Sequence, residues 1–381
     1  MRFATEIYER IQKIQIIIIL IIYENLISKV IEMKIRRVLK VLFLAIVVFG
    51  IGHVYAPTKV LLTVTEAEPS KTSYTLTNLG TLGGTYSRVG GINNRGQVVG
   101  TSSRASDGSH AFLWTERDGM RDIHTFGGPY SWASGINERG QVVGVGTTAF
   151  GFRAFLWTKQ DGMIDLGTLL GGHSSGAMAI NNRGQVVGWA TTASITAHAF
   201  RWTKQDGMID LGTLGGPNSI AYGINDRGQV VGYSELASGE THAFLWTERD
   251  GMRDLGTLGG PNSIAYDIND RGQVVGDGEL ASGETHAFLW TERDGMRDLG
   301  TFGGPFSHAR GINEQGQVVG YSKIAFGTIH AFIWTERDGM RDIGTPSDLY
   351  SYGVDINERG QVVGDIVTAF GETHAAIWTR N

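Results

Sequence analysis

The stretch HAFLWTERDGMRDLG occurs without change at residues 242–256 and again at 286–300. Its His, Trp, two Arg and two Asp are side-chain types that serve as metal ligands, general acids and bases, or ligand anchors. A shared metal centre would need several such His residues to converge to about 2 Å from one ion. Whether they can converge depends on the elements that carry them. A His stands before Ala at six places along the chain: His110, His198, His242, His286, His330 and His374.

These residues belong to a repeat whose period is 44 residues. The dipeptide Ile-Asn recurs at this spacing, with its Asn at Asn93, Asn137, Asn181, Asn225, Asn269, Asn313 and Asn357. A fixed period of this length indicates a solenoid, propeller or array, in which equivalent residues of different units lie far apart. We therefore expect each His to enter a strand and to bond loop backbone, or the Ser of every unit, and we expect no metal site. Those serines are Ser87, Ser131, Ser175, Ser219, Ser263, Ser307 and Ser351.

Each unit contains four short strand signals, which are clearest in the fourth copy. They are SIAYGIN (219–225), QVVGYSE (229–235), HAFLWT (242–247) and MRDLG (252–256). HAFLWT alternates His, Phe and Trp with smaller residues, the period of two that a strand requires. NDRG (225–228) and ERDG (248–251) have the residue types of type I turns, so tight hairpins join the first strand to the second and the third to the fourth.

Four antiparallel strands in about 44 residues is the size of one β-propeller blade. The repeat region opens with YTLTNLGTLGG (74–84), which matches a fourth-strand segment, and ends with HAAIWTRN (374–381), a third strand. We predict an all-β, seven-bladed β-propeller over residues 73–381, with four antiparallel strands per blade. Residues 73–80 should complete the last blade, since an open array would leave bare strand edges at both ends. The opening strand should then lie outermost, and each first strand should line the axis.

The N-terminal region predicts export. Residues 33–56 join a basic start, eleven apolar residues from Val41 to Ile51 and a small-residue end. This is the pattern of a secretory signal peptide, and an uncleaved membrane anchor is the alternative because Pro57 follows Ala56 directly. We expect an extracellular or periplasmic protein whose membrane contact is this segment alone. Residues 1–32 are either an over-extension upstream of a start at Met33 or an extra segment, and residues 57–72 form a polar linker.

Composition limits the partners and the chemistry. Of the 33 basic and 38 acidic residues, 25 and 34 lie beyond residue 56, and such an acidic body repels nucleic acid. The chain has no Cys, which excludes disulfides, thiolate nucleophiles and Cys-ligated metals. No nucleophile-elbow, zinc-protease or phosphate-loop motif is present. We therefore expect no cofactor and a monomeric protein.

The recurring His-Ala-Phe, together with IN-x-x-GQVVG and DLGTLGG, resembles the HAF repeat family of bacterial proteins. The resemblance covers residues 73–381, with Arg153 in place of the His in the second unit and Ala376 in place of the Phe in the last. It implies an extracellular repeat protein and carries no defined biochemical activity. The closure by a split blade is similar to that of WD-repeat propellers, which is a likeness of fold alone.

A binding site should lie where the units differ, because residues common to all seven copies are scaffold. Both tight turns fall on one face of the disc, so the longer loops share the opposite face, which we call the loop face. The residues flanking the repeated Ser vary there, and aromatic ones gather in units six, seven, one and two, while units three to five are small or plain. The predicted ligand-binding residues are Tyr86, Arg88, Tyr130, Trp132, Phe306, His308, Arg310, Tyr350 and Tyr352.

Exposed aromatic rings with a few polar groups suit stacking against sugars or gripping a peptide, although such rings also plug channels or pack locally. We predict a non-enzymatic exported propeller that binds a glycan or a protein through its loop face. A structural cell-surface repeat and a propeller polysaccharide lyase or glycosidase are the alternatives. A glycosidase needs two carboxylates roughly 5–10 Å apart. The unit-specific acids beside the axis, Asp267 and Asp355, lie two blades apart, which disfavours catalysis.

Overall fold

The computed structural model describes residues 73–106, 108–149, 151–325, 327–344 and 350–381. Every helix or strand in these ranges is a β-strand, so the all-β part of the prediction is confirmed. Over the same residues, no helix is long and apolar enough to cross a membrane. The predicted segments 1–32, 33–56 and 57–72 lie outside the described residues.

The sequence repeats form four-stranded antiparallel arrangements, as the strand signals predict, and those of units five and six are joined into one eight-stranded sheet by a parallel pairing of Thr285 with Phe306. Units one to three contain β2 (Gly83–Ile92), β3 (Val98–Arg104), β4 (Ser109–Thr115) and β5 (Gly119–Asp122); β6 (Ser131–Ile136), β7 (Val142–Thr148), β8 (Gly151–Thr158) and β9 (Gly162–Asp165); and β10 (Ser175–Ile180), β11 (Val186–Thr191), β12 (Ala197–Thr203) and β13 (Gly207–Asp210). Units four and five contain β14 (Gly215–Ile224), β15 (Val230–Leu236), β16 (Thr241–Thr247) and β17 (Gly251–Asp254); and β18 (Gly259–Ile268), β19 (Val274–Leu280), β20 (Thr285–Thr291) and β21 (Gly295–Asp298). Units six and seven contain β22 (Gly303–Ile312), β23 (Val318–Ile324), β24 (Ile329–Thr335) and β25 (Gly339–Asp342); and β26 (Tyr350–Ile356), β27 (Val362–Val367) and β28 (Thr373–Arg380).

The first strand of the described region pairs with the last. β1 (Tyr74–Asn78) runs antiparallel to β28, with Leu76 opposite Trp378, in a sheet of order β1-β28-β27-β26. The contact continues past the strand ends, because the Asn381 N–H donates to Ser73 O at 3.0 Å. β1 therefore occupies the position that a fourth strand occupies in the other units.

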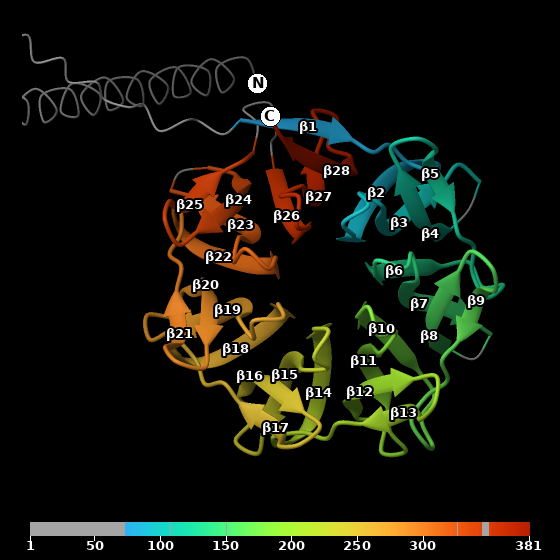
Figure 1. Ribbon diagram of the computed structural model, residues 1–381, viewed down its shortest axis with the longest axis horizontal. Helices are drawn as coiled ribbons and strands as arrows, with labels where there is room; N and C mark the ends of the chain where they lie inside the picture. Colours follow the sequence, from blue (N-terminus) through green and yellow to red (C-terminus); the bar gives the residue numbers. More distant parts are fainter. Residues whose placement is uncertain (1–72, 107, 150, 326, 345–349) are drawn as a thin grey trace, which may run out of the picture. The chain divides into compact units, whose positions relative to one another are not determined.

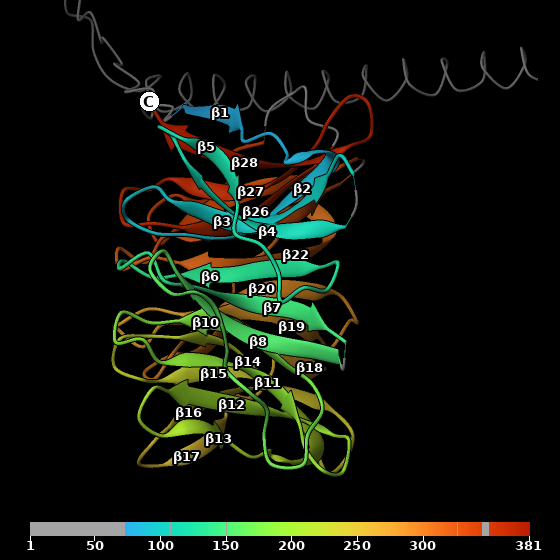
Figure 2. The ribbon, with the colours of Figure 1, turned by 90° about the vertical axis from the view of Figure 1, so that its right-hand side faces the viewer.

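The sheets are arranged around a central opening. Figure 1 shows β2, β6, β10, β14, β18, β22 and β26 nearest the opening, with the fourth strands and β1 at the periphery. Figure 2 shows that the strands run from one face of this arrangement to the other. The variable residues of the inner strands consequently face a common axis.

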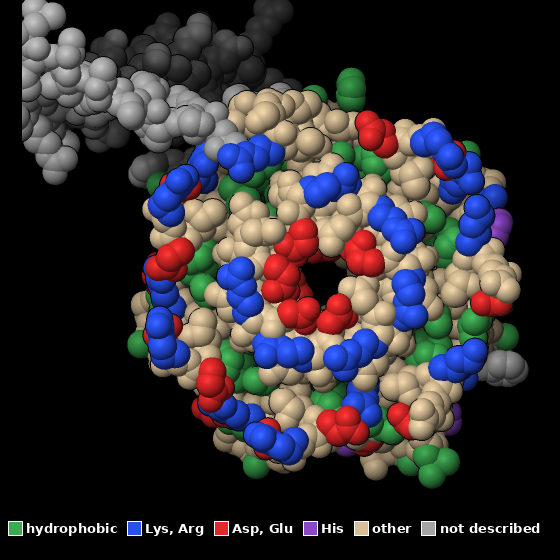
Figure 3. Space-filling view, viewed as in Figure 1, with side chains coloured by type: hydrophobic (Ala, Val, Ile, Leu, Met, Phe, Trp, Pro, Cys, Tyr) green, Lys and Arg blue, Asp and Glu red, His purple; other side chains and the backbone are tan. Residues whose placement is uncertain are grey.

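Two circuits of hydrogen bonds link the turns around this axis. Each repeated Asn donates its side-chain N–H to the main-chain oxygen of the equivalent Asn in the next unit, at 3.0–3.2 Å, and Asn357 donates to Asn93. In the second circuit, the side chain after each Asn accepts the backbone N–H of its counterpart in the preceding unit. Its members are Asn94, Glu138, Asn182, Asp226, Asp270, Glu314 and Glu358. Figure 3 shows acidic side chains around the central opening, as such a circuit requires.

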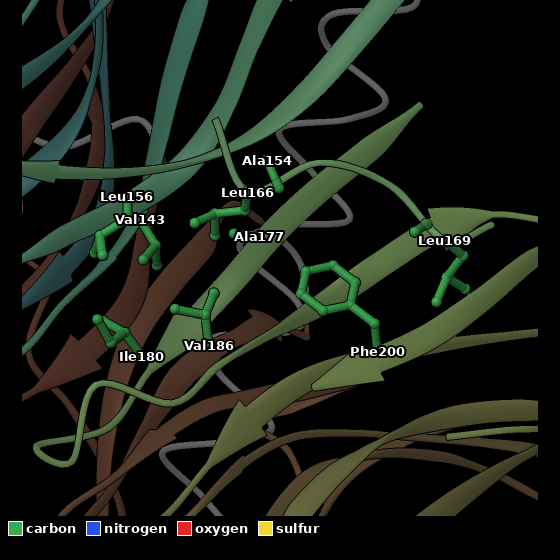
Figure 4. Packing of buried hydrophobic residues seen from close by; sticks show 10 residues of the cluster. Val143, Ala154, Leu156, Leu166, Leu169, Ala177, Ile180, Val186 and Phe200 are labelled. Atoms are coloured by element: carbon green, nitrogen blue, oxygen red, sulfur yellow. The ribbon is translucent and has the colours of Figure 1, made fainter. Parts of the chain in front are cut away.

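The core lies between adjacent sheets. Figure 4 shows one such layer, where Val143 and Leu156 of unit two meet Val186 and Phe200 of unit three. The Phe of His-Ala-Phe is fully buried wherever it occurs, as are the two Val of GQVVG. The following Gly is needed because the inner strand crosses closely: a Cβ on Gly276 would collide with the carbonyl oxygen of Ile264. The residues common to all copies thus hold the sheets together.

The inner strands differ in length from the prediction. β14 begins at Gly215, although the strand signal starts at Ser219. The reason is that Gly215 pairs with Leu236 at the end of the second strand, so part of the expected loop joins the sheet. Units one, five and six share this extension.

Candidate ligand-binding site

Each inner strand carries a β-bulge that directs one residue to the axis. In β14, Ala221 pairs with Gly232 and Gly223 pairs with Val231, which leaves Tyr222 as the extra residue. A bulge inserts an unpaired residue, re-aims its side chain and often lies beside a functional site. The bulge residues are Gly90, Ser134, Met178, Tyr222, Tyr266, Arg310 and Val354. All of them line one cavity of about 570 Å³, which we call the channel cavity.

One arm of aromatic residues leads from the rim to the channel cavity through unit two. The rings of Tyr130 and Trp132 stack with their centroids 5.9 Å apart and their planes 17° apart. Phe152 lies 6.1 Å from Trp132, and Tyr130 and Phe152 are each 43% exposed. Trp132 also lines the channel cavity. Tyr130 and Trp132 thus form an open platform, to which Phe152 adds a ring that the sequence analysis missed.

Arg88 and Tyr86 lie beside this platform. Arg88, Tyr86 and Trp132 line a second cavity of about 380 Å³, which shares Arg88 and Trp132 with the channel cavity. Arg88 is exposed, whereas Tyr86 is half-buried and its hydroxyl contacts Ser109 Oγ. Arg88 is therefore the cation available to a ligand on this platform.

A second aromatic arm crosses units six and seven. Phe306 lies 5.5 Å from His308, His308 lies 4.8 Å from Tyr321, and Tyr321 lies 5.1 Å from Tyr352, measured between ring centroids. Tyr350 is 40% exposed at the rim. Burial raises the pKa of Tyr352, while the charge of nearby Arg88 acts in the opposite direction and connects the two arms. The structure thus brings the predicted residues of the two arms to one side of the axis, with Tyr321 as an unpredicted link.

His308 also contacts an acid that the sequence analysis did not single out. Its Nδ1 lies 3.0 Å from Asp277 Oδ1, and Asp277 is 7% exposed. The two atoms are not aligned as a hydrogen bond, so the contact is an electrostatic one. Asp277 thus lies against the imidazole of the second arm.

The prediction that Arg310 supplies a polar contact at the mouth is wrong about its position. The bulge between Ala309 and Gly311 turns Arg310 into the channel cavity, where its guanidinium lies 3.8 Å from the centroid of the Tyr266 ring. Its Nη2 donates to the Tyr321 hydroxyl at 3.0 Å. A guanidinium over an aromatic face is held by cation–π attraction.

Units four and five have no aromatic residue beside the repeated Ser, but they carry tyrosines at the bulge position. Tyr222 lies 5.2 Å from Tyr266 and 6.0 Å from Tyr233, between ring centroids. Burial raises the pKa of Tyr222 to about 12 and raises that of Tyr266 further. Both hydroxyls are therefore neutral donors and acceptors in the channel wall. The residue three positions before each repeated Asn varies from unit to unit, and this variation would have identified Tyr222 and Tyr266.

Two carboxyl groups approach β22 from the units on either side. Asp267 Oδ2 accepts the Ile312 N–H at 2.9 Å, and Asp355 Oδ1 lies 3.2 Å from where a Cβ on Gly311 would be. Both residues line the channel cavity. Burial raises the pKa of Asp267 to about 6 and that of Asp355 to about 7, the latter with a contribution from the charge of Asp267. Both carboxyl groups therefore lie beside the same inner strand, although their residues belong to units five and seven.

The repeated His residues have different partners from those expected. The Nδ1 atoms of His110, His198, His242, His286 and His330 lie 2.7–2.9 Å from the Asp at the end of the fourth strand of their own unit. The prediction of a bond to loop backbone or to the repeated Ser is wrong, because each Ser Oγ instead accepts an Ala N–H from the preceding unit. In the last unit, Asn78 of β1 takes the place of the Asp and contacts His374 at 2.8 Å. Within the described part of the chain, no cluster of three or more His, Asp or Glu could hold a metal.

No protein family model matches the chain. No curated protein matches it in sequence either. Among solved structures, the β-propeller domain of the Trilobed protease from Pyrococcus furiosus is similar, with a TM-score of 0.52 and 10% identity over 77% of this chain and 95% of that chain. The fold is a β-propeller. A puromycin-hydrolyzing peptidase from Mycobacterium tuberculosis is also similar, with a TM-score of 0.52 and 12% identity over 81% of this chain and 53% of that chain.

These similarities correct the prediction that the protein is not an enzyme. Both similar structures belong to proteins named as a protease or a peptidase, so this fold gives no ground for excluding catalysis. The separation of Asp267 and Asp355 by two units disfavoured catalysis in the sequence, but both carboxyl groups approach β22. At 10% and 12% identity, the likeness shows the fold alone.

Proposed function

We propose that the protein is an exported seven-bladed β-propeller whose ring is closed by β1. The pairing of β1 with β28 and the return of the Asn circuit from Asn357 to Asn93 support closure. The signal-like residues 33–56 and the recurring His-Ala-Phe support an extracellular or periplasmic member of the HAF repeat family. This closure differs from the open velcro topology named for the Trilobed protease domain.

The loop face of this propeller binds a glycan. The observation that carries this proposal is the exposed stack of Tyr130 on Trp132, which leads into a cavity lined by tyrosines, Arg88 and Arg310. Flat aromatic faces stack against the C–H faces of sugar rings, and the polar groups fix their orientation. Arg88 lies where it can bond sugar hydroxyls at the edge of the platform.

Replacing the platform should abolish glycan retention without unfolding the protein. Trp132→Ala should lower the affinity roughly thirtyfold or more, because a buried aromatic anchor contributes at least about 2 kcal/mol. The measurement is a glycan-array screen followed by calorimetry on the best ligand. Ile264→Ala is the matched control, since Ile264 occupies the same position in unit five, away from both arms. Retention by Trp132→Ala equal to that of the wild type would refute the site.

The same screen separates the alternatives. A protein partner instead of a glycan would appear as retention on cell-surface protein and no retention on glycans. A purely structural surface repeat would retain neither, and the proposal would then be wrong. An unchanged melting temperature for Trp132→Ala would show that the indole ring of Trp132 does not stabilise the fold by packing.

Glycoside hydrolysis in the channel cavity is a second candidate function. The observation that favours it is the pair Asp267 and Asp355, with raised pKa values, in one cavity with Arg310 and two tyrosines. A protonated acid beside an ionised one is the arrangement of glycosidases.

If the channel hydrolyses a glycan, Asp267→Asn and Asp355→Asn should each lower the release of reducing ends by about a hundredfold or more. Asp294→Asn, in an exposed turn, is the control and should leave the release unchanged. Equal release of reducing ends by all variants would place the activity elsewhere. If the wild type releases none from any ligand found in the screen, glycoside hydrolysis is rejected as a function.

A further inference from the structure

Arginine side chains cover the repeated Trp at several junctions between units. Arg253 of unit four lies 5.7 Å from the centroid of the Trp290 ring in unit five, and its Nη1 donates to both carboxylate oxygens of Glu292 at 2.8 Å. Arg297 repeats these contacts one unit further, over Trp334 and with Glu336 at 2.8 Å. Trp290 and Trp334 are each only 4% exposed as a result. The Glu two residues after each Trp therefore holds the covering arginine in place.

The junction between units one and two departs from this pattern. Lys159 occupies the position of the Glu, so this junction lacks the carboxylate that would hold the equivalent arginine, Arg121, over the Trp. Arg121 instead turns back to Asp118 of its own turn, with its Nη2 3.1 Å from Asp118 Oδ1. Trp157 stays half-buried and lines a cavity of about 590 Å³. We call this space the Trp157 cavity.

The Trp157 cavity combines an apolar floor with a cationic rim. Leu113, Ile123 and the Trp157 ring form the floor. Three cations, Arg117, Arg121 and Lys159, stand at the rim with two acids, Asp118 and Asp122. Both acids already have partners, because Arg117 and Arg121 contact Asp118 while His110 and Arg104 contact Asp122. The rim thus favours an anionic ligand, and the floor favours a ring with an apolar face.

We propose that the Trp157 cavity binds an acidic sugar, with its ring stacked on Trp157 and its carboxylate paired with Lys159 and Arg121. A uronic acid presents C–H groups on one face and a carboxylate at its edge, which matches a tryptophan floor beside two cations. The excess of positive charge at the rim disfavours the binding of a cationic ligand. This site lies apart from the loop-face platform and does not depend on the proposed glycan function there.

The repeat itself supplies the test. Lys159→Glu supplies the Glu found at the junctions of units four with five and five with six, so Arg121 should cross over Trp157 and close the cavity. Affinity for trigalacturonate, measured by calorimetry, should then fall by about tenfold or more. Lys159→Gln removes the cation without offering Arg121 a partner, and it should cost less than Lys159→Glu. Circular dichroism checks that each variant folds.

The converse variant provides a matched gain of function. Glu292→Lys removes the partner of Arg253 and should open the same cavity over Trp290, adding a second trigalacturonate site. All titrations are repeated in a Trp132→Ala background, which removes the loop-face platform and should leave this binding unchanged. A neutral galactose trisaccharide should bind about tenfold more weakly or worse.

Four outcomes would overturn the proposal. They are an absence of trigalacturonate binding to the wild type, equal affinity of the wild type and Lys159→Glu, equal affinity for the neutral trisaccharide, and loss of binding in the Trp132→Ala background. Binding of benzoate without binding of trigalacturonate would show an aromatic anion site and reject the sugar. Loss of binding in the Trp132→Ala background would place the site on the loop face instead.

Discussion

A chain lacking residues 1–78 should fail to form a stable ring, whereas a chain lacking only residues 1–72 should keep the fold of residues 73–381. The deletion removes β1 and exposes the outer edge of β28, including the side of Trp378, which is fully buried in the intact fold. Lost backbone hydrogen bonds contribute about 1 kcal/mol each, and the partly buried side chains of Tyr74 and Leu76 each add part of the about 1.5–3 kcal/mol that full burial contributes. The sum exceeds about 5 kcal/mol, which is comparable to the whole stability of many domains.

Thermal unfolding followed by circular dichroism, together with tryptophan fluorescence, measures this effect. We expect the shorter chain to lose its cooperative transition and to shift its fluorescence to the red. A peptide of residues 73–80 added in trans should restore part of the signal, because the edge of β28 stays available for pairing. Equal melting temperatures for the two truncated chains would show that β1 is dispensable and that the ring is not held closed by it.

Asp355→Asn should make the protein more stable at pH 8 and leave its stability nearly unchanged at pH 4. Burial raises the pKa of Asp355 to about 7 in the folded protein, above the ordinary value of 3.8. The folded state therefore binds a proton more tightly than the unfolded state, and the free energy of unfolding falls as the pH rises from about 4 to about 7. A rise in pKa of this size changes the free energy of unfolding by about 2–4 kcal/mol. We expect the lower figure, because the carboxyl group faces a channel.

Denaturant unfolding at several pH values gives the difference between Asp355→Asn and the wild type. Asp294→Asn is the control, because a hydrogen bond with Arg293 lowers the pKa of Asp294 in its exposed turn. A lowered pKa stabilises the folded state above the unfolded pKa, so this control should show a small effect of the opposite sign. A pH-independent difference for Asp355→Asn would mean that its carboxyl group titrates alike in both states.

The repeat carried most of the fold prediction. A constant spacing of the Ile-Asn pairs gives the unit, and alternation within HAFLWT gives the strand that buries Phe244 and Trp246. The extension of β14 back to Gly215 was not predictable, because the run GGPN has the composition of a loop and joins the sheet only through pairing with Leu236. The His–Asp pairs were missed for a similar reason. They depend on the register between the third and fourth strands, which places Phe244 opposite Asp254 and so brings His242 to the same Asp.

The candidate site was predicted in its outer part only. Residues such as Tyr130 and Trp132 alternate with the repeated Ser, and alternation alone places them on one side of the strand. Tyr222 and Tyr266 follow the same alternation one step further, but the predicted site was drawn mainly from the residues beside the repeated Ser, so these tyrosines were missed. A bulge depends on pairing that no single strand encodes, so the inward turn of Arg310 could not be derived from its neighbours.

The bulges have a consequence for how such a protein changes over generations. A bulge residue has no opposite partner in the ladder, so exchanging it alters the wall of the channel and leaves the sheet pairing intact. Gly90 is the exception, because a Cβ there would collide with the main-chain oxygen of Ala133. The residues present range from Gly90 and Ser134 to Tyr266 and Arg310, and all of them line the channel cavity. Duplication can therefore copy a unit whole, and single substitutions at the bulge positions other than Gly90 can then change the shape and polarity of the channel wall at little cost to the sheet pairing. The repeated strands and turns thus form a constant scaffold, and the bulge residues are the positions at which its channel varies.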